Sequence, residues 1–166
     1  APGLAERILA NIHFRSNANL EARRLTLLAQ AEYFQGNFIE SEGQAERIDR
    51  LVLKLEDKNL GARLHKEILQ LRIDALTDQG RYYQAEDVLI EEINRIKKIV
   101  PVDQDAIGNL LCSRAMCCLH AMRPRHAREL YQQVESLVLK PGGEAEFRKF
   151  VLCAKLAEES RDLDQS

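Results

Sequence analysis

Two short stretches of this chain, QGNFIES at residues 35–41 and QGRYYQA at residues 79–85, share one pattern. In each, a run with helical periodicity ends in Gln-Gly, an aromatic residue follows two positions after the glycine, and a small residue stands three positions beyond that aromatic. The two glycines are 44 residues apart, and a degenerate third copy, MRPRHA at residues 122–127, places its small residue 42 positions after Ala85. Recurrence at such a period is typical of stacked helical hairpins. The period therefore predicts a helical repeat protein.

Hydrophobic periodicity divides the chain into about eight helical segments separated by short breaks. The predicted repeats span about residues 20–60, 61–102 and 103–141, and the flanking helices span residues 4–14 and 144–160. In the last of these helices the apolar positions are Phe147, Phe150, Val151 and Ala154. A lone helical hairpin leaves one apolar side uncovered, so each pair must stack on the next. We therefore expect one all-α domain over residues 1–166, a right-handed superhelical stack of antiparallel helix pairs.

The repeat period aligns residues of similar size in successive units. Three such sets are Leu25, Leu69 and Leu111; Ala31, Ala75 and Cys117; and Ser41, Ala85 and Ala127. Small residues allow two helices to approach closely where they cross. Gly36 and Gly80 are predicted to supply the left-handed backbone conformation that ends a helix. Phe38 and Tyr82 are predicted to wedge into the turn that follows.

At these residues the chain resembles the tetratricopeptide repeat (TPR) family, whose units carry a Trp or Leu, a small residue, a Gly-x-Tyr turn and an Ala early in the second helix. The resemblance covers about Leu20 to Leu139. Its repeats are longer than the family's usual length of about 34 residues, and Arg72, Arg114 and Glu92 stand where the family has apolar or small residues. The long repeats are also weakly similar to those of proteasome-lid and signalosome scaffold subunits, and to sensor domains of large bacterial transcription activators.

Composition and charge exclude several classes of function. Hydrophobic residues make up 45% of the chain and charged residues 30%, as expected of a globular protein with a solvated surface. The net charge of −2 supplies no broad basic field for nucleic acid. No apolar run reaches the roughly 18 residues that a membrane-spanning helix needs, and the N-terminus lacks the hydrophobic core of a signal peptide. We therefore expect an intracellular protein, cytoplasmic or nuclear, that binds neither nucleic acid nor membrane. Because the sequence begins at Ala1 and not at Met, we also expect it to be a fragment of a longer protein.

The sequence carries no motif of known chemistry: no Gly-rich phosphate loop, His-Glu-x-x-His, nucleophile elbow or Cys-x-x-Cys. We therefore predict a protein that is not an enzyme and that needs no cofactor. Its four cysteines all stand in apolar helical runs: Cys112, Cys117, Cys118 and Cys153. Four cysteines in this length are too few for a disulfide scaffold, so we expect reduced, buried thiols.

One cluster, CCLH at residues 117–120 with His126 beyond the turn, offers atoms that bind soft metals. Cys117 and His120 share a helical face. Cys117 and Cys118, however, point about 100° apart on a helix, and Cys117 occupies the packing position that alanines hold in the other two repeats. We therefore expect these residues to pack between helices and to bind no metal.

Charged residues give two further candidates. A basic run surrounds the third turn: Arg123, Arg125, His126 and Arg128. Such a run could meet phosphate or an acidic peptide, but no aromatic residues are interleaved with it, so we expect a solvated turn. Two pairs of carboxylates stand in helical segments: Glu91 with Glu92, and Glu158 with Glu159. Neighbours in sequence diverge on a helix, so we expect these side chains to face solvent.

The repeats predict an interaction module, either a scaffold or adaptor in a larger complex or, alternatively, the regulatory or sensor domain of a multidomain protein such as a transcription regulator. Aromatic residues near the turns, Tyr33, Phe34 and Tyr83, support a protein partner. Tyr33 and Phe34 could instead pack against the N-terminal helix. The alternatives differ in whether a partner binds stoichiometrically or only with an effector.

The resemblance to TPR arrays implies a binding face, because in that family the first helix of each pair lines the concave side. The corresponding positions are Arg23, Thr26, Gln30, Tyr33 and Phe34, then Gln70, Asp74, Thr77 and Asp78, then Asn109, Cys112, Met116 and His120. The family's clamp for a C-terminal carboxylate needs a Lys and an Asn where this chain has Thr26 and Gln30. We therefore expect the ligand to be a helical or extended protein segment rather than a C-terminal tail.

Overall fold

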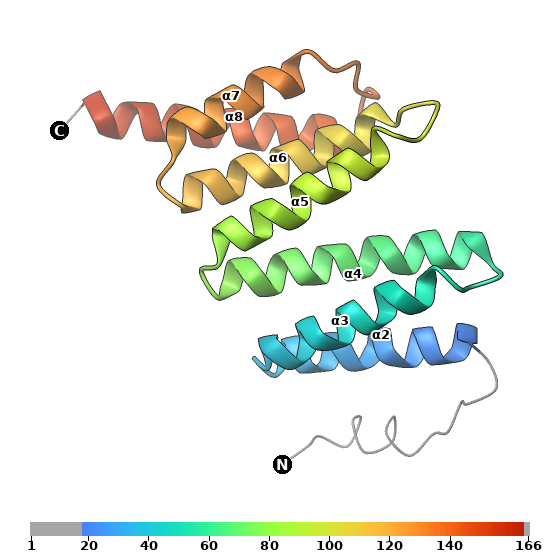
Figure 1. Cartoon of the computed structure of the whole chain (residues 1–166). Helices are drawn as coiled ribbons and strands as arrows, with labels where there is room; N and C mark the ends of the chain where they lie inside the picture. The colour runs from blue at the N-terminus through green and yellow to red at the C-terminus, as the bar shows by residue number, and fades with distance from the viewer. Residues whose placement is uncertain (1–17, 165–166) are drawn as a thin grey trace. The chain divides into compact units, whose positions relative to one another are not determined.

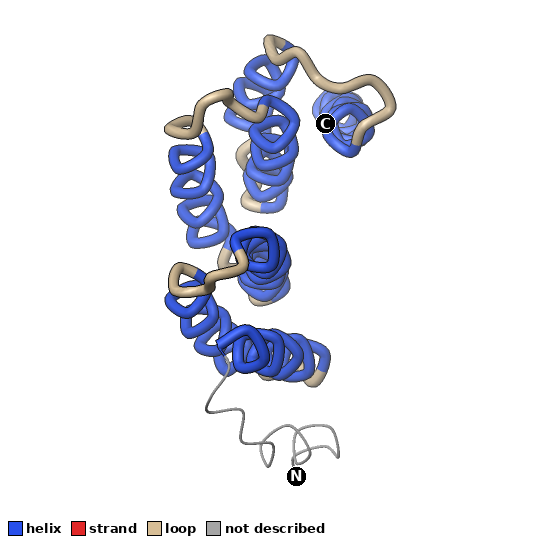
Figure 2. Tube along the Cα trace, turned by 90° about the vertical axis from the view of Figure 1, so that its right-hand side faces the viewer, coloured by secondary structure: helices blue, strands red, loops and turns tan. Residues whose placement is uncertain are grey.

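The computed structural model describes residues 18–164, and these residues form helices joined by short connections, with no strand among them (Figures 1 and 2). The helices are α2 (Ala18–Phe34), α3 (Phe38–Val52), α4 (Lys58–Asp78), α5 (Tyr82–Ile96), α6 (Gln104–His120), α7 (Pro124–Glu135) and α8 (Glu144–Asp164). The predicted all-α class is therefore confirmed. The helix predicted for residues 4–14 lies outside the described residues.

Contacts between helices divide the chain into two compact units, Ala1–Gly80 and Arg81–Ser166. In the first unit α2, α3 and α4 pack on one another, and in the second unit α6 contacts α5, α7 and α8, while α7 also contacts α8. The boundary falls between the two helices of the predicted second repeat, residues 61–102. The single domain and its continuous three-repeat stack therefore stay predictions.

Each unit has its own apolar core, and the predicted crossing residues lie in or beside it. In the first unit the core is formed by Leu25, Ala29, Ala45, Ile48, Ile68 and Leu71. In the second unit the core includes Leu111, Ala115, Ala127, Leu130, Val134, Leu152 and Leu156. The small residues Ser41, Ala85 and Ala127 are all buried, as predicted. The Ser41 hydroxyl donates a hydrogen bond of 2.9 Å to the Ala29 carbonyl, which satisfies its polar group at the α2–α3 crossing.

The glycine turns have the backbone conformation that the repeat pattern predicts. Gly36 has φ +80° and Gly80 has φ +70°. After α2, Gly36 N–H donates to the Tyr33 carbonyl and Asn37 N–H donates to the Glu32 carbonyl, both at 2.9 Å. This pair of bonds is the Schellman motif, which satisfies the last carbonyls of a helix and requires a left-handed residue.

The third turn repeats this geometry without a glycine. Met122 stands at the position equivalent to Gly36 and Gly80, and its φ is +57°. Its N–H donates to Leu119 O at 2.9 Å, and Arg123 N–H donates to Cys118 O at 2.8 Å, so the same Schellman bonds close α6. Pro124 then occupies the first turn of α7, where its missing N–H costs nothing. The degenerate third copy is therefore a real structural repeat of the turn.

The charged residues that interrupt the family pattern all have ionic partners. Arg72 Nη1 lies 3.3 Å from Asp49 Oδ2 on the preceding helix, and Arg114 Nε lies 2.9 Å from Glu86 Oε1 on the preceding helix. The prediction that Glu92 faces solvent is wrong, because its side chain is buried and its carboxylate accepts two hydrogen bonds from Arg95, at 2.5 and 2.7 Å. A guanidinium one turn away neutralises the carboxylate, so the side chain can leave water.

Candidate functional site

Part of the predicted binding face assembles where α2 and α4 end. The Tyr33 hydroxyl donates a hydrogen bond of 2.6 Å to Asp78, and Gln70 donates one of 2.8 Å to Asp74. The hydrogen bond to Asp78, together with burial and the charges of Asp78 and Asp74, raises the pKa of Tyr33 to about 12. The phenol therefore stays protonated and remains a hydrogen-bond donor. Beside it, the Phe34 ring meets the Tyr33 ring edge to face and is 83% exposed.

Other predicted face residues are buried or partly buried. Thr26 is buried and its hydroxyl donates to the Ala22 carbonyl, so it cannot line a groove. Cys112 is also buried, and Met116 is partly buried against the core of the second unit. Thr77 donates to carbonyls of its own helix. Of these four residues, Thr26 and Cys112 are the two whose burial keeps them from contacting a ligand in the described structure.

The remaining predicted residues have mixed surroundings. Arg23 is exposed, and Gln30 and Asn109 are half-buried. His120 is exposed and stacks on Tyr82, with ring centroids 5.6 Å apart. Within the first unit, the structure therefore brings together Tyr33, Phe34, Asp74 and Asp78. The predicted positions from the third repeat belong to the other unit, so the full set stays a prediction.

A buried carboxylate that the sequence analysis did not single out binds arginines from two other segments of the second unit. Glu86 on α5 is 6% exposed. Its Oε1 accepts from Arg114 Nε on α6 at 2.9 Å, and its Oε2 accepts from Arg123 Nη1 in the α6–α7 turn at 2.8 Å. Burial alone would raise the pKa of Glu86, but the hydrogen bonds and charges of Arg123 and Arg114 outweigh it and lower the pKa. Glu86 is therefore an anion that ties three successive segments together.

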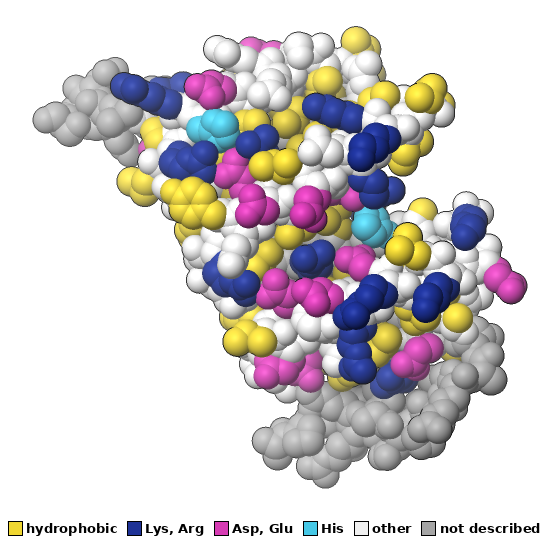
Figure 3. Space-filling model, viewed as in Figure 1, with side chains coloured by type: hydrophobic (Ala, Val, Ile, Leu, Met, Phe, Trp, Pro, Cys, Tyr) yellow, Lys and Arg dark blue, Asp and Glu magenta, His cyan; other side chains and the backbone are white. Residues whose placement is uncertain are grey.

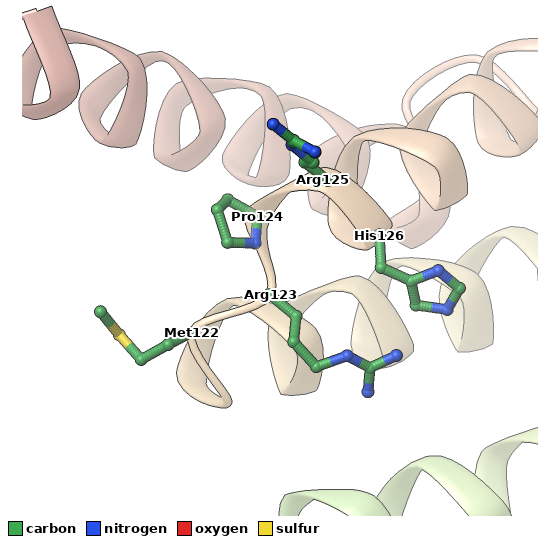
Figure 4. A pocket seen from close by; sticks show the side chains of 5 residues that line it. All are labelled: Met122, Arg123, Pro124, Arg125 and His126. Carbon is green, nitrogen blue, oxygen red and sulfur yellow. The ribbon is translucent and has the colours of Figure 1, made fainter.

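The predicted basic run is partly drawn into this cluster. In Figure 4 Arg123 and His126 point to the same side of the turn, whereas Arg125 points away. His126 lies between two carboxylates, with Nε2 3.4 Å from Glu86 and Nδ1 3.1 Å from Glu129. The Arg123 guanidinium also lies 5.2 Å from the centre of the Tyr83 ring. The turn is therefore not simply solvated, since Arg123 forms an ion pair with Glu86 and the His126 ring lies within 3.4 Å of two carboxylates.

Glu86, Cys118 and His126 present ligand-type atoms within 4.8 Å of one another, a different set from the one the sequence suggested. Two guanidinium groups already bind both oxygens of Glu86. Burial, with the negative charge of Glu86, raises the pKa of the Cys118 thiol to about 11. Metal binding needs a thiolate and an available carboxylate. The charges around these three residues therefore oppose a cation, and the arrangement fits an ion-pair cluster better than a metal centre.

The cysteine prediction holds for three residues and is wrong for the fourth. Cys112, Cys117 and Cys118 are buried free thiols, and burial raises the pKa of each to about 11. Cys153 is exposed on α8. The sequence placed it in an apolar run, but α8 has apolar residues on two sides and only one of them faces the core.

Two helices carry apolar side chains on the side that faces away from their own unit. On α2, Ala22 and Ala29 are fully buried, while Leu20, Leu27 and Phe34 are 42%, 53% and 83% exposed. On α8, the buried residues are Ala145, Leu152 and Leu156. The apolar positions predicted from sequence for α8 are instead exposed: Phe147, Phe150, Val151 and Ala154. Periodicity correctly identified an apolar stripe on α8, but α8 has two such stripes, and periodicity does not indicate which of them packs against the neighbouring helices.

Acidic and basic side chains lie next to one another over the face shown in Figure 3, in keeping with the small net charge. Among the described residues, no helix has the length and apolar character needed to cross a membrane. Comparison with protein-family models, with curated proteins and with solved structures finds no match to this chain.

Proposed function

We propose that this chain is a non-catalytic protein–protein interaction module that acts as a scaffold or adaptor in a larger complex. The observation that carries the proposal is the outer stripe of α2, formed by Leu20, Leu27 and Phe34. A helix that is apolar on both sides is normally covered on both sides, and a helix that closes a helical stack normally has a polar outer face. The outer stripe therefore supports a partner on this side of α2.

The spacing of the outer stripe specifies the kind of partner. Its residues are seven positions apart, two helical turns, so they lie in one line along α2, as one of the two apolar positions of a helix-pairing heptad does. Arg23 and Gln30, both predicted to bind a partner, lie along one edge of the stripe, and Arg23 is exposed. An amphipathic helix with an apolar seam, and with an acidic residue opposite Arg23, would complement this surface.

The right-handed superhelical stack of antiparallel helix pairs, similar to the TPR family, is part of the same proposal. Its support is local: left-handed turns recur at Gly36, Gly80 and Met122, and small buried residues recur three positions into the helices that follow. The absence of catalytic activity is likewise proposed from the chemistry of the described residues. Glu86, one of two buried acids among the described residues, is neutralised by two arginines, and the buried thiols have raised pKa values.

A matched set of variants tests the outer stripe. Leu27→Ser should remove the centre of the stripe, and Phe34→Ser its most exposed ring, so each should weaken partner binding about tenfold or more, as loss of a hot-spot residue does. Leu53→Ser is the control, because Leu53 is 80% exposed in the same unit but lies beyond the end of α3. Each tagged variant, after its melting temperature is shown to be unchanged, is used to capture partners from cells, and the affinity for the recovered partner is then measured.

The outcomes separate the alternatives. Capture that survives Leu53→Ser and fails with Leu27→Ser supports the proposal, and equal capture by all variants contradicts it. Capture that depends on a small-molecule effector favours the regulatory or sensor alternative. In the sequence, Leu4, Ile8 and Ile12 form a second apolar pattern shortly before α2, within residues 4–14. If they compete with the partner, replacing all three by Ser should increase its affinity.

A further inference from the structure

The outer face of α8, formed by Phe147, Phe150, Val151 and Ala154, is a second open apolar surface. Phe147 is 67% exposed, Phe150 73% and Val151 37%. The opposite face of the same helix is filled, because Leu152 and Leu156 belong to the core of the second unit and Ala145 lies against Gly108 of α6. We propose that α8 pairs in antiparallel orientation with α8 of a second copy of this chain.

Packing within the second unit shows why this face needs a neighbour. Helix α6 also has apolar residues on several sides, and it is covered by α5 and α7 and by α8. Helix α8 contacts α6 and α7 through its buried face, and no other helix in the described part of this unit contacts it substantially. Exposed apolar residues scattered singly are normal, but four at helical spacing form a continuous stripe. The stripe therefore has the form of an interface.

The stripe is complementary to itself. When two copies of α8 run antiparallel about a two-fold axis between residues 150 and 151, Phe147 lies opposite Ala154 of the second copy, and Phe150 lies opposite Val151. Each large ring then meets a smaller side chain, which is the alternation that lets two helices interdigitate. A two-fold pairing uses the same surface on both copies, which is how most soluble homodimers form.

The charges beside the stripe favour the antiparallel orientation. Glu144 and Lys155 are eleven residues apart, about three helical turns, so they lie on the same flank of the stripe. Each also has an exposed ionic partner on its own helix, Arg148 for Glu144 and Glu158 for Lys155, so a contact with the second copy would have to compete with these pairs. In the antiparallel pair, Glu144 of each copy lies beside Lys155 of the other copy, which gives two equivalent contacts. In a parallel pair that flank meets the opposite flank at the same height, which places Glu144 beside Glu146 of the second copy. Complementary charge at the rim of an interface sets orientation more than affinity.

The size of the stripe sets the expected strength. A phenylalanine buries about 150–250 Å², so the residues from both copies, already partly covered, would bury roughly 800 Å² in total, below the range of stable complexes. The pairing should therefore be weak and depend on concentration. A small, symmetric stripe with matched charges fits a second copy better than a large foreign partner.

The test is the oligomeric state of the full chain, measured by sedimentation equilibrium over a wide range of concentrations. The wild type should pass from monomer to dimer as concentration rises, and Phe150→Ser should raise the dimer dissociation constant at least about tenfold. Val138→Ser is the matched control, because Val138 is 81% exposed in the same unit but lies outside α8. Circular dichroism confirms that each variant keeps its helical content.

Charge reversal tests the orientation. Glu144→Lys and Lys155→Glu should each weaken the dimer, and the double variant should restore it, because the two reversed residues again attract one another across the interface. Each reversal also faces a like charge on its own helix, Arg148 or Glu158, so only variants whose helical content is unchanged by circular dichroism are compared. A chain that stays monomeric at every concentration, or a dimer that Phe150→Ser leaves unchanged, would overturn the proposal. A dimer that the double variant fails to restore would overturn the antiparallel arrangement. None of these results bears on partner capture through α2, so the two proposals can fail separately.

Discussion

The left-handed residue that ends α6 offers a measurement of backbone strain, because the same turn occurs elsewhere in the chain with glycine. Met122 has φ +57°, a conformation that costs a residue with a side chain roughly 1–2 kcal/mol. Its side chain is 83% exposed, so deleting it loses little burial. Glycine also makes the unfolded chain more flexible, which lowers the free energy of unfolding by about 0.5–1 kcal/mol and offsets part of this gain. Met122→Gly should therefore raise the free energy of unfolding by about 0.5–1 kcal/mol.

The reverse substitutions should have the opposite sign. A Cβ built on Gly36 or Gly80 would meet no atom within 4 Å outside its immediate chain neighbours, so there is no steric clash to add to the conformational cost. Gly36→Ala and Gly80→Ala should therefore each lower the free energy of unfolding by about 1 kcal/mol through the left-handed conformation alone. The three turns together measure the free-energy cost of a left-handed residue with a Cβ at equivalent positions of the repeat.

Urea denaturation and thermal melting followed by circular dichroism are suitable assays. For a chain of this size, 1 kcal/mol corresponds to a change in Tm of about 2–4 °C. The matched control is Met122→Ala, which removes the exposed side chain but keeps a Cβ, and it should leave stability nearly unchanged. If Met122→Ala stabilises the protein as much as Met122→Gly, the effect comes from the side chain and not from the backbone, and the reasoning fails.

Two further predictions concern buried polar groups. Glu86→Gln should lower the free energy of unfolding at pH 7 by about 2 kcal/mol, less than for a fully buried pair because Arg114 and Arg123 are partly exposed. Folding lowers the pKa of Glu86, so its contribution to stability is complete above the unfolded pKa of about 4.5 and is lost as the pH falls through the lower folded pKa. In urea titrations, the free energies of unfolding of the wild type and the variant should therefore converge at acidic pH. A thiol reagent should modify exposed Cys153 of the native protein quickly and buried Cys118 only on unfolding, as mass spectrometry can follow; equal rates would contradict the burial pattern.

Local features of the fold could be read from the sequence, because each depends on residues close together in the chain. The glycines that end α2 and α4, the proline that begins α7 and the small residue three positions into each of α3, α5 and α7 all occupy the expected positions. Even the register of the degenerate turn at Met122 follows from the repeat period. The seven-residue spacing of Leu20, Leu27 and Phe34 was also present in the sequence, and a search for a second apolar stripe on the first described helix would have found it.

The all-α class and the positions of the turns were therefore predictable from the amino-acid sequence, since helix periodicity and turn chemistry act over three to seven residues. The buried stripe of α8 was not predictable, because a helix with two apolar sides can bury either one and the neighbouring helices determine which. The contacts of Glu86 with Arg114 and Arg123 were not predictable either, because these residues are 28 and 37 positions away in the chain. No local pattern links residues so far apart, since their pairing depends on how three segments pack around one buried charge.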